Sequence, residues 1–238
     1  MKKLDSLTIF FPFLNDEGTV ERQISFAYKI GRQVAKDLEV IAIHGGASND
    51  NTMGKILEMK QKYPSLIVVD RFDNSEGYAV IRHGFDEASK EWVFYTDGDA
   101  QYRIEKSLIP LIRKQQATNA DVINGYKKNR KDSFWRVVLG GLYAHLSRLL
   151  LQLPVRDVDC DFRLIRRRLL TKIKLESNGA SILPELVKKL HLSGAKFSEI
   201  AIPHYSRIWG ESNYNILDLA KEKVLGDFRL YFRMRKYL

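Results

Sequence analysis

The stretch EWVFYTDGDAQY, residues 91 to 102, indicates both a fold class and a site. Its first half is rich in aromatic and β-branched residues, which is typical of a buried strand. The run then turns at Gly98, where Asp97 and Asp99 stand one residue apart and the amide of Gln101 follows. Crowded carboxylates repel each other and are costly to desolvate, and a cation relieves both costs. The stretch therefore predicts a strand that ends at a cation site.

Further apolar runs resemble this one and alternate with helical patterns. The runs are SLTIFFPFL (6–14), LEVIAIHGG (38–46), SLIVVDRF (65–72) and, later, ADVINGY (120–126). Apolar residues at helix spacing occupy 19–36, 52–63, 78–89 and 107–116. Strand–helix–strand alternation predicts an α/β fold with a mainly parallel sheet covered by helices. Ligands of such sheets bind at the carboxyl ends of the strands, where NDEG, GGASND and DGDAQ fall, so these polar loops are expected to converge.

The bulk composition fits one large domain with an appendage. The chain has 238 residues, and we expect a domain over 1–215 and a basic amphipathic helix over 216–238. Cys160 is the single cysteine, which excludes an intramolecular disulfide, favours a cytosolic setting and predicts a small buried side chain. The apolar run near the N-terminus ends in Pro12 and acids, and we interpret it as a strand rather than a signal peptide.

The formal net charge of +10 indicates an anionic partner, unless the excess is simply solubilising. Nucleic acid, a phosphorylated substrate and a membrane surface are the candidates. No helix-turn-helix, RNA-binding aromatic motif or zinc finger is present, so nucleic acid is the least supported. Residues 137–155 form the most apolar window, but His145 and Arg148 interrupt it, which predicts an amphipathic helix rather than a membrane span.

The D-x-D turn has two interpretations. Mg²⁺ or Mn²⁺ typically takes one or two carboxylates together with substrate phosphates, which suits Asp97 and Asp99. The alternative is a solvated turn that caps the next helix. The histidines show no ligand spacing for zinc.

Seven segments in order resemble family 2 glycosyltransferases, most closely the branch of dolichyl- and polyprenyl-phosphate sugar synthases. They are FFPFLNDEGTVERQI, EVIAIHGGASNDNT, NSEGYAVIRHGF, EWVFYTDGDAQY, VINGYKKNR, VRDVDCDFRLIRRRLL and PHYSRIWGESNYN, and they cover Ser6 to Asn215. The resemblance implies a GT-A fold, Rossmann-like with helices on both faces of the sheet. It also implies a nucleotide-sugar donor, a UDP- or GDP-sugar, and a divalent metal.

The resemblance assigns roles to particular residues. A metal set is implied at Asp97, Asp99 and Gln101, and Arg207 matches the arginine that closes over the diphosphate. The implied nucleotide-sugar set is Pro12, Asn15, Asp16, Glu17, His44, Gly46, Ser48, Arg82, Asp97, Gly98 and Lys127. The implied acceptor-phosphate set is Lys127, Arg130, Arg136, Arg207 and Ser212. Asp97, Asp99 and Arg207 are the expected catalytic residues, because metal and cations stabilise the charge of the leaving nucleoside diphosphate.

One departure from the family concerns the second strand. The family usually shows an Asp pair there, whereas this chain has His44, Gly45 and Gly46. Either His44 replaces the acid and contacts the base, or the site prefers another nucleotide, or activity is impaired. Asp157, Asp159 and Asp161 are expected to brace the floor of the site rather than bind a second metal.

Three functions remain open from the sequence. The leading one is inverting, metal-dependent transfer of one sugar to a polyprenyl phosphate, at the cytoplasmic, inner face of the membrane, with peripheral attachment. The second transfers sugar to a hydroxyl and needs a general base, for which Glu185 and Asp161 are the candidates. The third is a non-catalytic nucleotide- or membrane-binding relative. A homodimer is compatible with all three.

Overall fold

A mixed sheet of seven strands forms the centre of the computed structural model, which describes residues 1–46, 48–71, 77–128, 134–210 and 216–235. The strands lie in the order β3-β2-β1-β4-β6-β5-β7. Their bounds are β1 Leu4–Phe13, β2 Ala35–His44, β3 Ile67–Asp70, β4 Trp92–Tyr95, β5 Val122–Lys128, β6 Arg163–Arg166 and β7 Phe197–Pro203. β6 is antiparallel to both of its neighbours, and the other pairings are parallel. The predicted α/β class with a mainly parallel sheet is confirmed.

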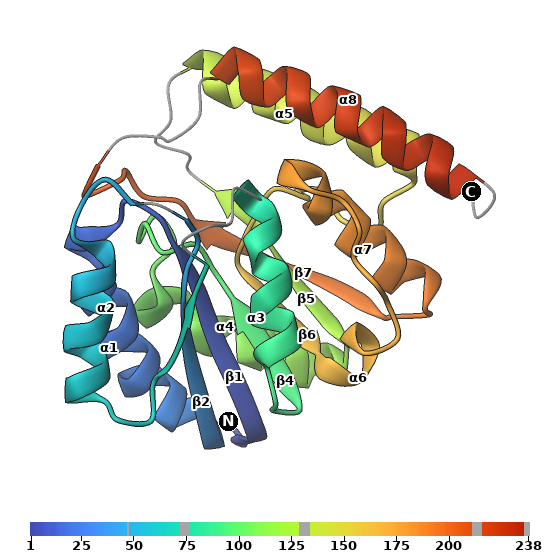
Figure 1. Cartoon of the computed structure of the whole chain (residues 1–238). Helices are drawn as coiled ribbons and strands as arrows, with labels where there is room; N and C mark the ends of the chain where they lie inside the picture. Colours follow the sequence, from blue (N-terminus) through green and yellow to red (C-terminus); the bar gives the residue numbers. More distant parts are fainter. Residues whose placement is uncertain (47, 72–76, 129–133, 211–215, 236–238) are drawn as a thin grey trace.

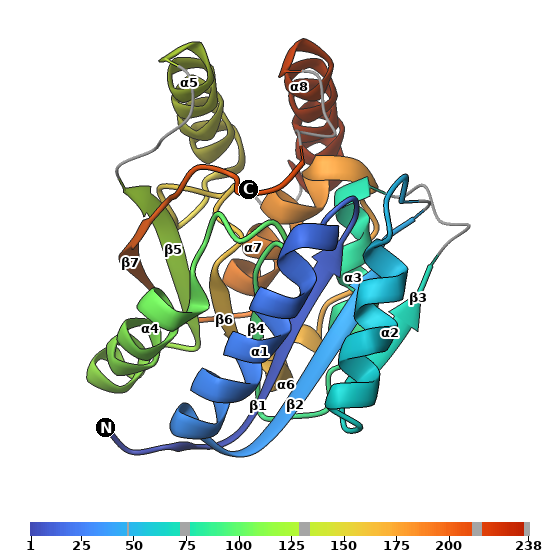
Figure 2. The ribbon, with the colours of Figure 1, turned by 90° about the vertical axis from the view of Figure 1, so that its left-hand side faces the viewer.

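Helices cover both faces of this sheet (Figures 1 and 2). The helices are α1 Glu17–Val34, α2 Thr52–Lys62, α3 Ile81–Glu87, α4 Ile104–Thr118, α5 Phe134–Leu151, α6 Arg167–Leu170, α7 Ile182–Leu192 and α8 Ile216–Met234. The 3₁₀ turns are η1 Gly77–Val80 and η2 Gly179–Ser181. Most expected helices are present, but the pattern over 78–89 splits into η1 and the shorter α3.

Alternation along the strands builds two cores. In β4, Trp92 and Phe94 join the core under α1, α2 and α4, whereas Val93 and Tyr95 join the core under α3 and α7. Successive side chains of a strand point to opposite faces, so a four-residue apolar run serves both layers. The same alternation explains β6, a strand of four residues. Leu164 and Ile165 are fully buried on opposite faces, and the helix starts only at Arg167.

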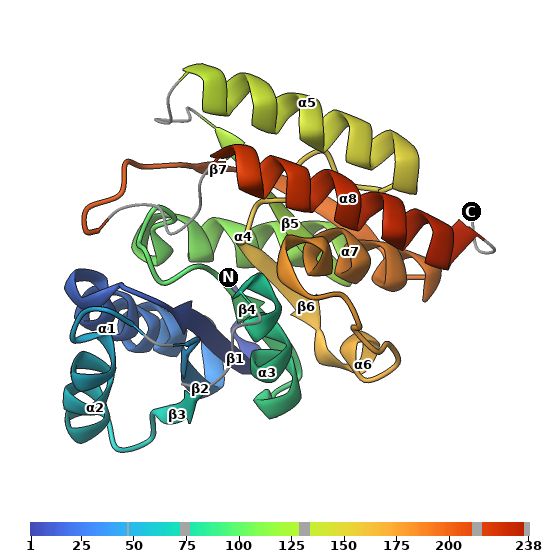
Figure 3. The same ribbon diagram turned by 45° about the horizontal axis from the view of Figure 1, so that its top comes forward.

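α5 and α8 form an outer layer over the end of the molecule at which the parallel strands finish (Figures 1 and 3). The two helices lie side by side, and α8 also contacts η2. Across the described ranges, no helix combines the length and apolarity that crossing a membrane requires.

Candidate active site

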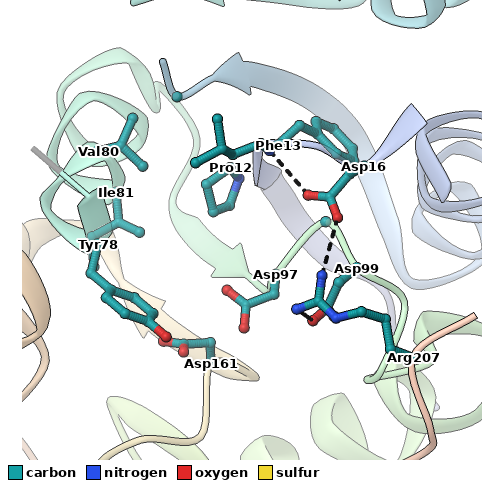
Figure 4. Close-up of a pocket in the computed structure, with 13 residues that line it drawn as sticks. Pro12, Phe13, Asp16, Tyr78, Val80, Ile81, Asp97, Asp99, Asp161 and Arg207 are labelled. Atoms are coloured by element: carbon teal, nitrogen blue, oxygen red, sulfur yellow. Dashed lines mark hydrogen bonds and ion pairs between the residues drawn. The ribbon is translucent and has the colours of Figure 1, made fainter. Parts of the chain in front are cut away.

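A pocket of about 120 Å³ opens at the carboxyl ends of β1, β2 and β4 (Figure 4). Its charged lining is Asp16, Asp97, Asp99, Asp161 and Arg207. Its remaining lining is Pro12, Phe13, Leu14, Gly45, Tyr78, Val80, Ile81 and Gly98. The NDEG and DGDAQ loops therefore meet here, together with a segment that follows β7.

The D-x-D turn is pressed against the end of β1. The amide of Gly98 donates a hydrogen bond to the carbonyl of Pro12 at 3.1 Å. A Cβ on Gly98 would lie 2.3 Å from the Phe13 ring and 2.7 Å from the Pro12 carbonyl, so the turn requires glycine. Both flanking carboxylates consequently face the pocket, as Figure 4 shows.

Asp16 enters the pocket from the loop that begins α1. Its backbone amide donates to the hydroxyl of Thr52 at 2.8 Å, and its Oδ2 accepts the amide of Leu14 at 3.0 Å. Its Oδ1 is buried and has no hydrogen-bond partner in the described part of the chain. Burial, with the nearby Asp99 and Asp50 charges, raises the pKa of Asp16 to about 7.

Arg207 bridges the two sources of acid. Its Nη2 donates to Oδ2 of Asp99 at 2.7 Å, and its Nη1 lies 3.8 Å from Oδ1 of Asp16. Gln101 holds the segment that contains Arg207. Its side-chain NH₂ group donates to the carbonyl of Tyr205 at 3.1 Å, and its backbone carbonyl accepts the Tyr205 amide at 3.0 Å. The Gln101 side chain thus braces this segment and is not part of the pocket lining.

The charge balance of the pocket is strongly acidic. Burial, with Asp161 and Asp99 next in effect, raises the pKa of Asp97 well above its usual value. Burial likewise raises the pKa of Asp161 to about 6, against the opposing effects of Arg163 and Lys127. Four carboxylates and one guanidinium therefore share this small space, which favours an added cation.

The residues fit a hard divalent metal. Carboxylate oxygens are its preferred ligands, and Oδ1 of Asp16 and Oδ1 of Asp161 are both buried without a hydrogen-bond partner in the described part of the chain. The described residues contain no group of three or more His, Cys, Asp or Glu side chains arranged to hold a metal by themselves. Two carboxylates, such as those of Asp97 and Asp99, are nevertheless enough for a metal that shares its coordination with substrate phosphates.

Three residues of the expected nucleotide set join the two loops instead of lining the pocket. Oδ1 of Asn15 accepts the amide of Asn49 at 2.7 Å, and Oε2 of Glu17 accepts the amide of Asn51 at 3.1 Å. The hydroxyl of Ser48 accepts the amide of Asn15 at 3.2 Å. These bonds fix the entrance loops relative to each other, and Gly46, which follows β2, has a φ of 144° that favours glycine.

His44 is buried behind the pocket, which does not favour direct contact with a base. Its Nδ1 lies 2.9 Å from Oδ1 of Asp70 and its Nε2 lies 3.0 Å from Oγ of Ser48. Both ring nitrogens therefore have partners within the protein. Gly45 takes the place in the lining that we expected of His44.

Arg82 and Lys127 also differ from the expectation that they face the donor. Nη2 of Arg82 donates to the carbonyl of Ser177 at 2.9 Å and reaches Oδ1 of Asn178 at 3.2 Å. Nζ of Lys127 donates to the carbonyl of Asp159 at 2.5 Å and lies 3.6 Å from Oδ1 of Asp157. Both cations brace neighbouring loops and are absent from the pocket lining.

Part of the expected acceptor-phosphate set lies outside the residues that the structure describes. Arg130 and Ser212 fall in undescribed segments, and only the backbone of Arg136, in α5, is described. Glu185 is fully buried, accepts the amides of Glu176 and Ser177, and pairs with Lys189. It therefore anchors a loop and is unsuited to act as a general base.

Tyr78 and Asp161 line the pocket, although the sequence does not predict that either residue faces the donor. The sequence does not predict Tyr78 as a site residue, because an aromatic residue at the start of an amphipathic helix is usually part of the hydrophobic core. Asp161 was expected chiefly to brace the floor, with Asp157 and Asp159. Asp157 and Asp159 do brace it, through Lys127 and Lys223, but Asp161 points into the pocket.

Comparison with known sequences identifies the class. Residues 8–174 match the sequence model of glycosyl transferase family 2, and the chain belongs to that family. A curated relative is the undecaprenyl-phosphate 4-deoxy-4-formamido-L-arabinose transferase of Proteus mirabilis (strain HI4320), 22% identical over 222 residues. That match covers 92% of this chain and 65% of the relative, so the chain spans about two thirds of that protein's length.

Solved structures agree on the fold, which is GT-A as expected. Glucosyl-3-phosphoglycerate synthase from Mycobacterium tuberculosis, in complex with Mn²⁺, UDP and glucosyl-3-phosphoglycerate, superposes with a TM-score of 0.66 at 15% identity, covering 93% of this chain and 78% of that one. A mannosyltransferase from Pyrobaculum calidifontis in complex with GDP-Man and Mn²⁺ gives a TM-score of 0.66 at 16% identity, covering 95% and 64%.

Proposed function

We propose that this chain transfers one sugar from a nucleotide-sugar donor to a polyprenyl phosphate, with a divalent metal and inversion at the anomeric carbon. The observation that carries the proposal is the convergence of Asp16, Asp97, Asp99 and Arg207 on one pocket in a family 2 chain. The curated relative acts on undecaprenyl phosphate, and the two solved neighbours were captured with Mn²⁺ and UDP or GDP-Man. These names support the donor, metal and acceptor classes.

The residues have distinct tasks in this reaction. Asp97 and Asp99 would hold Mg²⁺ or Mn²⁺, which when bound neutralises diphosphate charge. Arg207 is positioned to leave Asp99 for the diphosphate as the sugar departs, because a guanidinium pairs well with phosphate oxygens. An acceptor phosphate oxygen attacks the anomeric carbon and the bond to the nucleoside diphosphate breaks. The acceptor is already anionic at neutral pH, so this transfer needs no general base.

The outer layer supplies the surface at which a lipid acceptor would be met. The solvent-facing apolar side chains are Val138, Leu142, Leu146 and Leu149 on α5 and Val224, Leu225, Phe228 and Phe232 on α8. Between the two helices, Nζ of Lys223 on α8 lies 4.8 Å from the centre of the Tyr143 ring on α5, and burial, with the Asp159 and Asp227 charges, raises the pKa of Tyr143. Helices that turn apolar faces outward suit the interface of a bilayer.

Charge favours an anionic leaflet as the occupant of this surface. Lys221 and Arg229 on α8 and Arg235 just beyond its end are exposed, whereas Lys223 and Arg233 form ion pairs with the body of the protein. At about 1 kcal/mol for each exposed cation, the three contribute roughly 3 kcal/mol before screening by salt. We therefore propose peripheral attachment at the inner face of the membrane.

The hydroxyl-acceptor alternative keeps one supporting observation. Asp161 lines the pocket, and its pKa, raised by burial to about 6, suits a carboxylate that takes a proton from a hydroxyl. Asp161→Asn separates the two reactions. It should abolish transfer to a hydroxyl and leave at least a tenth of the transfer to a phosphate.

The experiment is a screen of UDP-, GDP- and dTDP-sugars for donor hydrolysis and for transfer, with Mn²⁺ and with EDTA. Polyprenyl phosphate in anionic liposomes is one acceptor, and soluble sugars and phosphoglycerate are the others. The proposal expects metal-dependent turnover with one donor and preference for the lipid. Preference for a soluble hydroxyl would replace it with the alternative, and no turnover with any donor would favour a non-catalytic relative.

A further inference from the structure

The contact between α8 and the body of the protein combines apolar packing of Leu230 and Met234 with ion pairs, one of which reaches toward the candidate active site. Lys223 leaves α8 with Nζ 4.8 Å from the centre of the Tyr143 ring on α5. The same Nζ lies 2.6 Å from Oδ2 of Asp159, and the two side chains are only 12% and 15% exposed. A largely buried ion pair between segments far apart in the sequence fixes their relative position, because neither charge can be left alone without a large desolvation cost.

Asp159 belongs to the segment that forms the floor of the pocket. Its carbonyl accepts Nζ of Lys127, and Oδ2 of Asp157 accepts the Lys127 amide at 2.9 Å. Two residues further on, Asp161 faces the pocket itself. Arg163 closes the segment from below, donating to the carbonyl of Val158 at 3.0 Å. Lys223 thus binds Asp159, which lies two residues before Asp161, a side chain of the pocket.

The balance of charge shows why this segment needs a cation from α8. Asp157, Asp159 and Asp161 alternate along five residues and face Lys127, Arg163 and Lys223. Lys127 and Arg163 lie on the sheet, in β5 and β6. Lys223 comes from α8, so removal of α8 from the body leaves the Asp159 carboxylate without this partner.

We propose that Lys223 is a positioning residue for the donor site, and that the seating of α8 on the body is a condition for donor binding. This proposal rests on the proposed function only for the identity of the ligand. The structural half, that Lys223 orders residues 157–161, stands by itself. The consequence is that the outer layer and the donor pocket are one mechanical unit, so that displacement of α8 weakens the pocket from a distance.

The test compares Lys223→Met with Lys221→Met, which removes an exposed charge two residues earlier on α8, and with Lys223→Arg. Hydrogen exchange of residues 157–163 in the full chain is measured first. The proposal expects residues 157–163 to exchange at least tenfold faster in Lys223→Met than in wild type. In Lys221→Met and Lys223→Arg they should exchange at the wild-type rate. Wild-type exchange in Lys223→Met, or equal acceleration in both methionine variants, would overturn it.

Calorimetric titration of UDP and GDP in the presence of Mn²⁺ then tests the link to the donor site. Affinity should fall at least tenfold in Lys223→Met and stay within twofold of wild type in the other two variants. Unchanged affinity together with faster exchange would overturn the donor half of the proposal. If the wild type itself binds neither nucleotide, the proposed function fails, while hydrogen exchange still decides the positioning role.

A second pair of changes guards against simple misfolding. Lys223→Met with Asp159→Asn removes both charges and leaves no unpaired buried ion, so this double variant should fold. The proposal expects residues 157–163 to exchange faster than in wild type even there. Wild-type protection in a folded double variant would show that the ion pair has no positioning role.

Discussion

At the scale of single residues, Arg207 lies among the carboxylates of the candidate site. It pairs with Asp99 at 2.7 Å and lies 3.8 Å from Asp16, so in the free protein it partly neutralises the acids of the pocket. Under the proposed function, a cation in this position would compete with a metal for the Asp99 carboxylate and would assist a bound diphosphate. The same side chain should therefore oppose one ligand and favour the other.

We expect Arg207→Gln to bind Mn²⁺ alone more tightly than wild type, by about fivefold, because loss of a nearby positive charge favours a second cation. The same variant should bind nucleoside diphosphate with Mn²⁺ about tenfold more weakly, because a charged hydrogen bond to phosphate is lost. Calorimetry measures both. Arg103→Gln is the matched control, since Arg103 stacks on Tyr205 at 4.0 Å beside the same segment. Weaker binding of both ligands would contradict this account.

Asp16 carries a pH dependence with a definite sign. Its pKa rises from 3.8 to about 7 on folding, so between these values the folded state holds a proton that the unfolded state has lost. The contribution of this group to stability therefore falls as pH rises from about 4 to about 7. Asp16→Asn should become progressively more stable than wild type over that range, as urea unfolding at several pH values would show. A constant difference between the two proteins would show that the pKa of Asp16 is not raised.

At the scale of elements, Glu185 shows how α7 is tied to its surroundings. It is fully buried, accepts the amides of Glu176 and Ser177, and pairs with Lys189 at 2.7 Å and Arg233 at 3.3 Å. Because Arg233 lies on α8, the contact also holds the outer layer. Removal of the carboxylate leaves two amides without their acceptor and takes one of several partners from Lys189.

Glu185→Leu should lower the free energy of unfolding by about 3–5 kcal/mol, the usual loss when one partner of a buried ion pair is removed. Glu176→Leu is the control, because that side chain is about half exposed and its pair with Lys189 is at the surface. It should change stability by less than about 1 kcal/mol. Equal effects of the two changes, measured by denaturant unfolding, would contradict the anchoring role of Glu185.

The apolar outer face of α5 and α8 makes a separate prediction. Leu149→Glu with Phe232→Glu places two charges on side chains that are 63% and 61% exposed, so the fold should be kept. Co-sedimentation with anionic liposomes should fall at least about tenfold at low salt, because two apolar contacts become charged. The control Leu57→Glu changes an exposed leucine on α2, away from this layer, and should leave binding intact. Equal binding of all three proteins would remove this surface from the membrane.

Element by element, the sequence predicts what local pattern and order encode. Alternating strands and helices, the turn at Gly98 and the loops at the carboxyl ends all follow from spacing that is visible in one chain. The antiparallel β6 does not, because its four residues match several short patterns and its place between β4 and β5 depends on long-range pairing. The pattern over 78–89 likewise does not show where η1 ends and α3 begins, because the apolar spacing is the same across both elements.

Site residues divide in a similar way. Asp16, Asp97, Asp99 and Arg207 were predicted, and the structure brings them together. His44 and Lys127 carry the right chemistry in the right loops, but their side chains point toward internal partners, which a sequence does not show. Asp161 is the converse case, since only the folded chain shows which of three alternating acids reaches the pocket.

At the scale of the whole molecule, α5 and α8 form a layer over the end of the sheet at which the parallel strands finish (Figures 1 and 3). The acidic pocket opens at that end of the sheet, and the layer carries exposed apolar side chains. Ion pairs of Lys223 and Arg233 and the buried Leu230 and Met234 hold that layer to the body, whereas its exposed side chains include large apolar residues. Simple removal of residues after 215 would therefore disturb the body of the protein as well as the surface. Point substitutions separate the two effects.

The most direct test of the central claim is transfer of labelled sugar from a nucleotide donor to polyprenyl phosphate in liposomes, in wild type and in Asp99→Ala. Asp99 accepts hydrogen bonds from Arg207 and the Gln101 amide, but its removal also relieves the crowding of carboxylates in the pocket, so the variant should fold. The account predicts Mn²⁺-dependent transfer by wild type and a loss of at least about a hundredfold in the variant, the scale of removing a group that stabilises transition-state charge. Equal turnover by the two proteins, or transfer that is indifferent to EDTA, would contradict it.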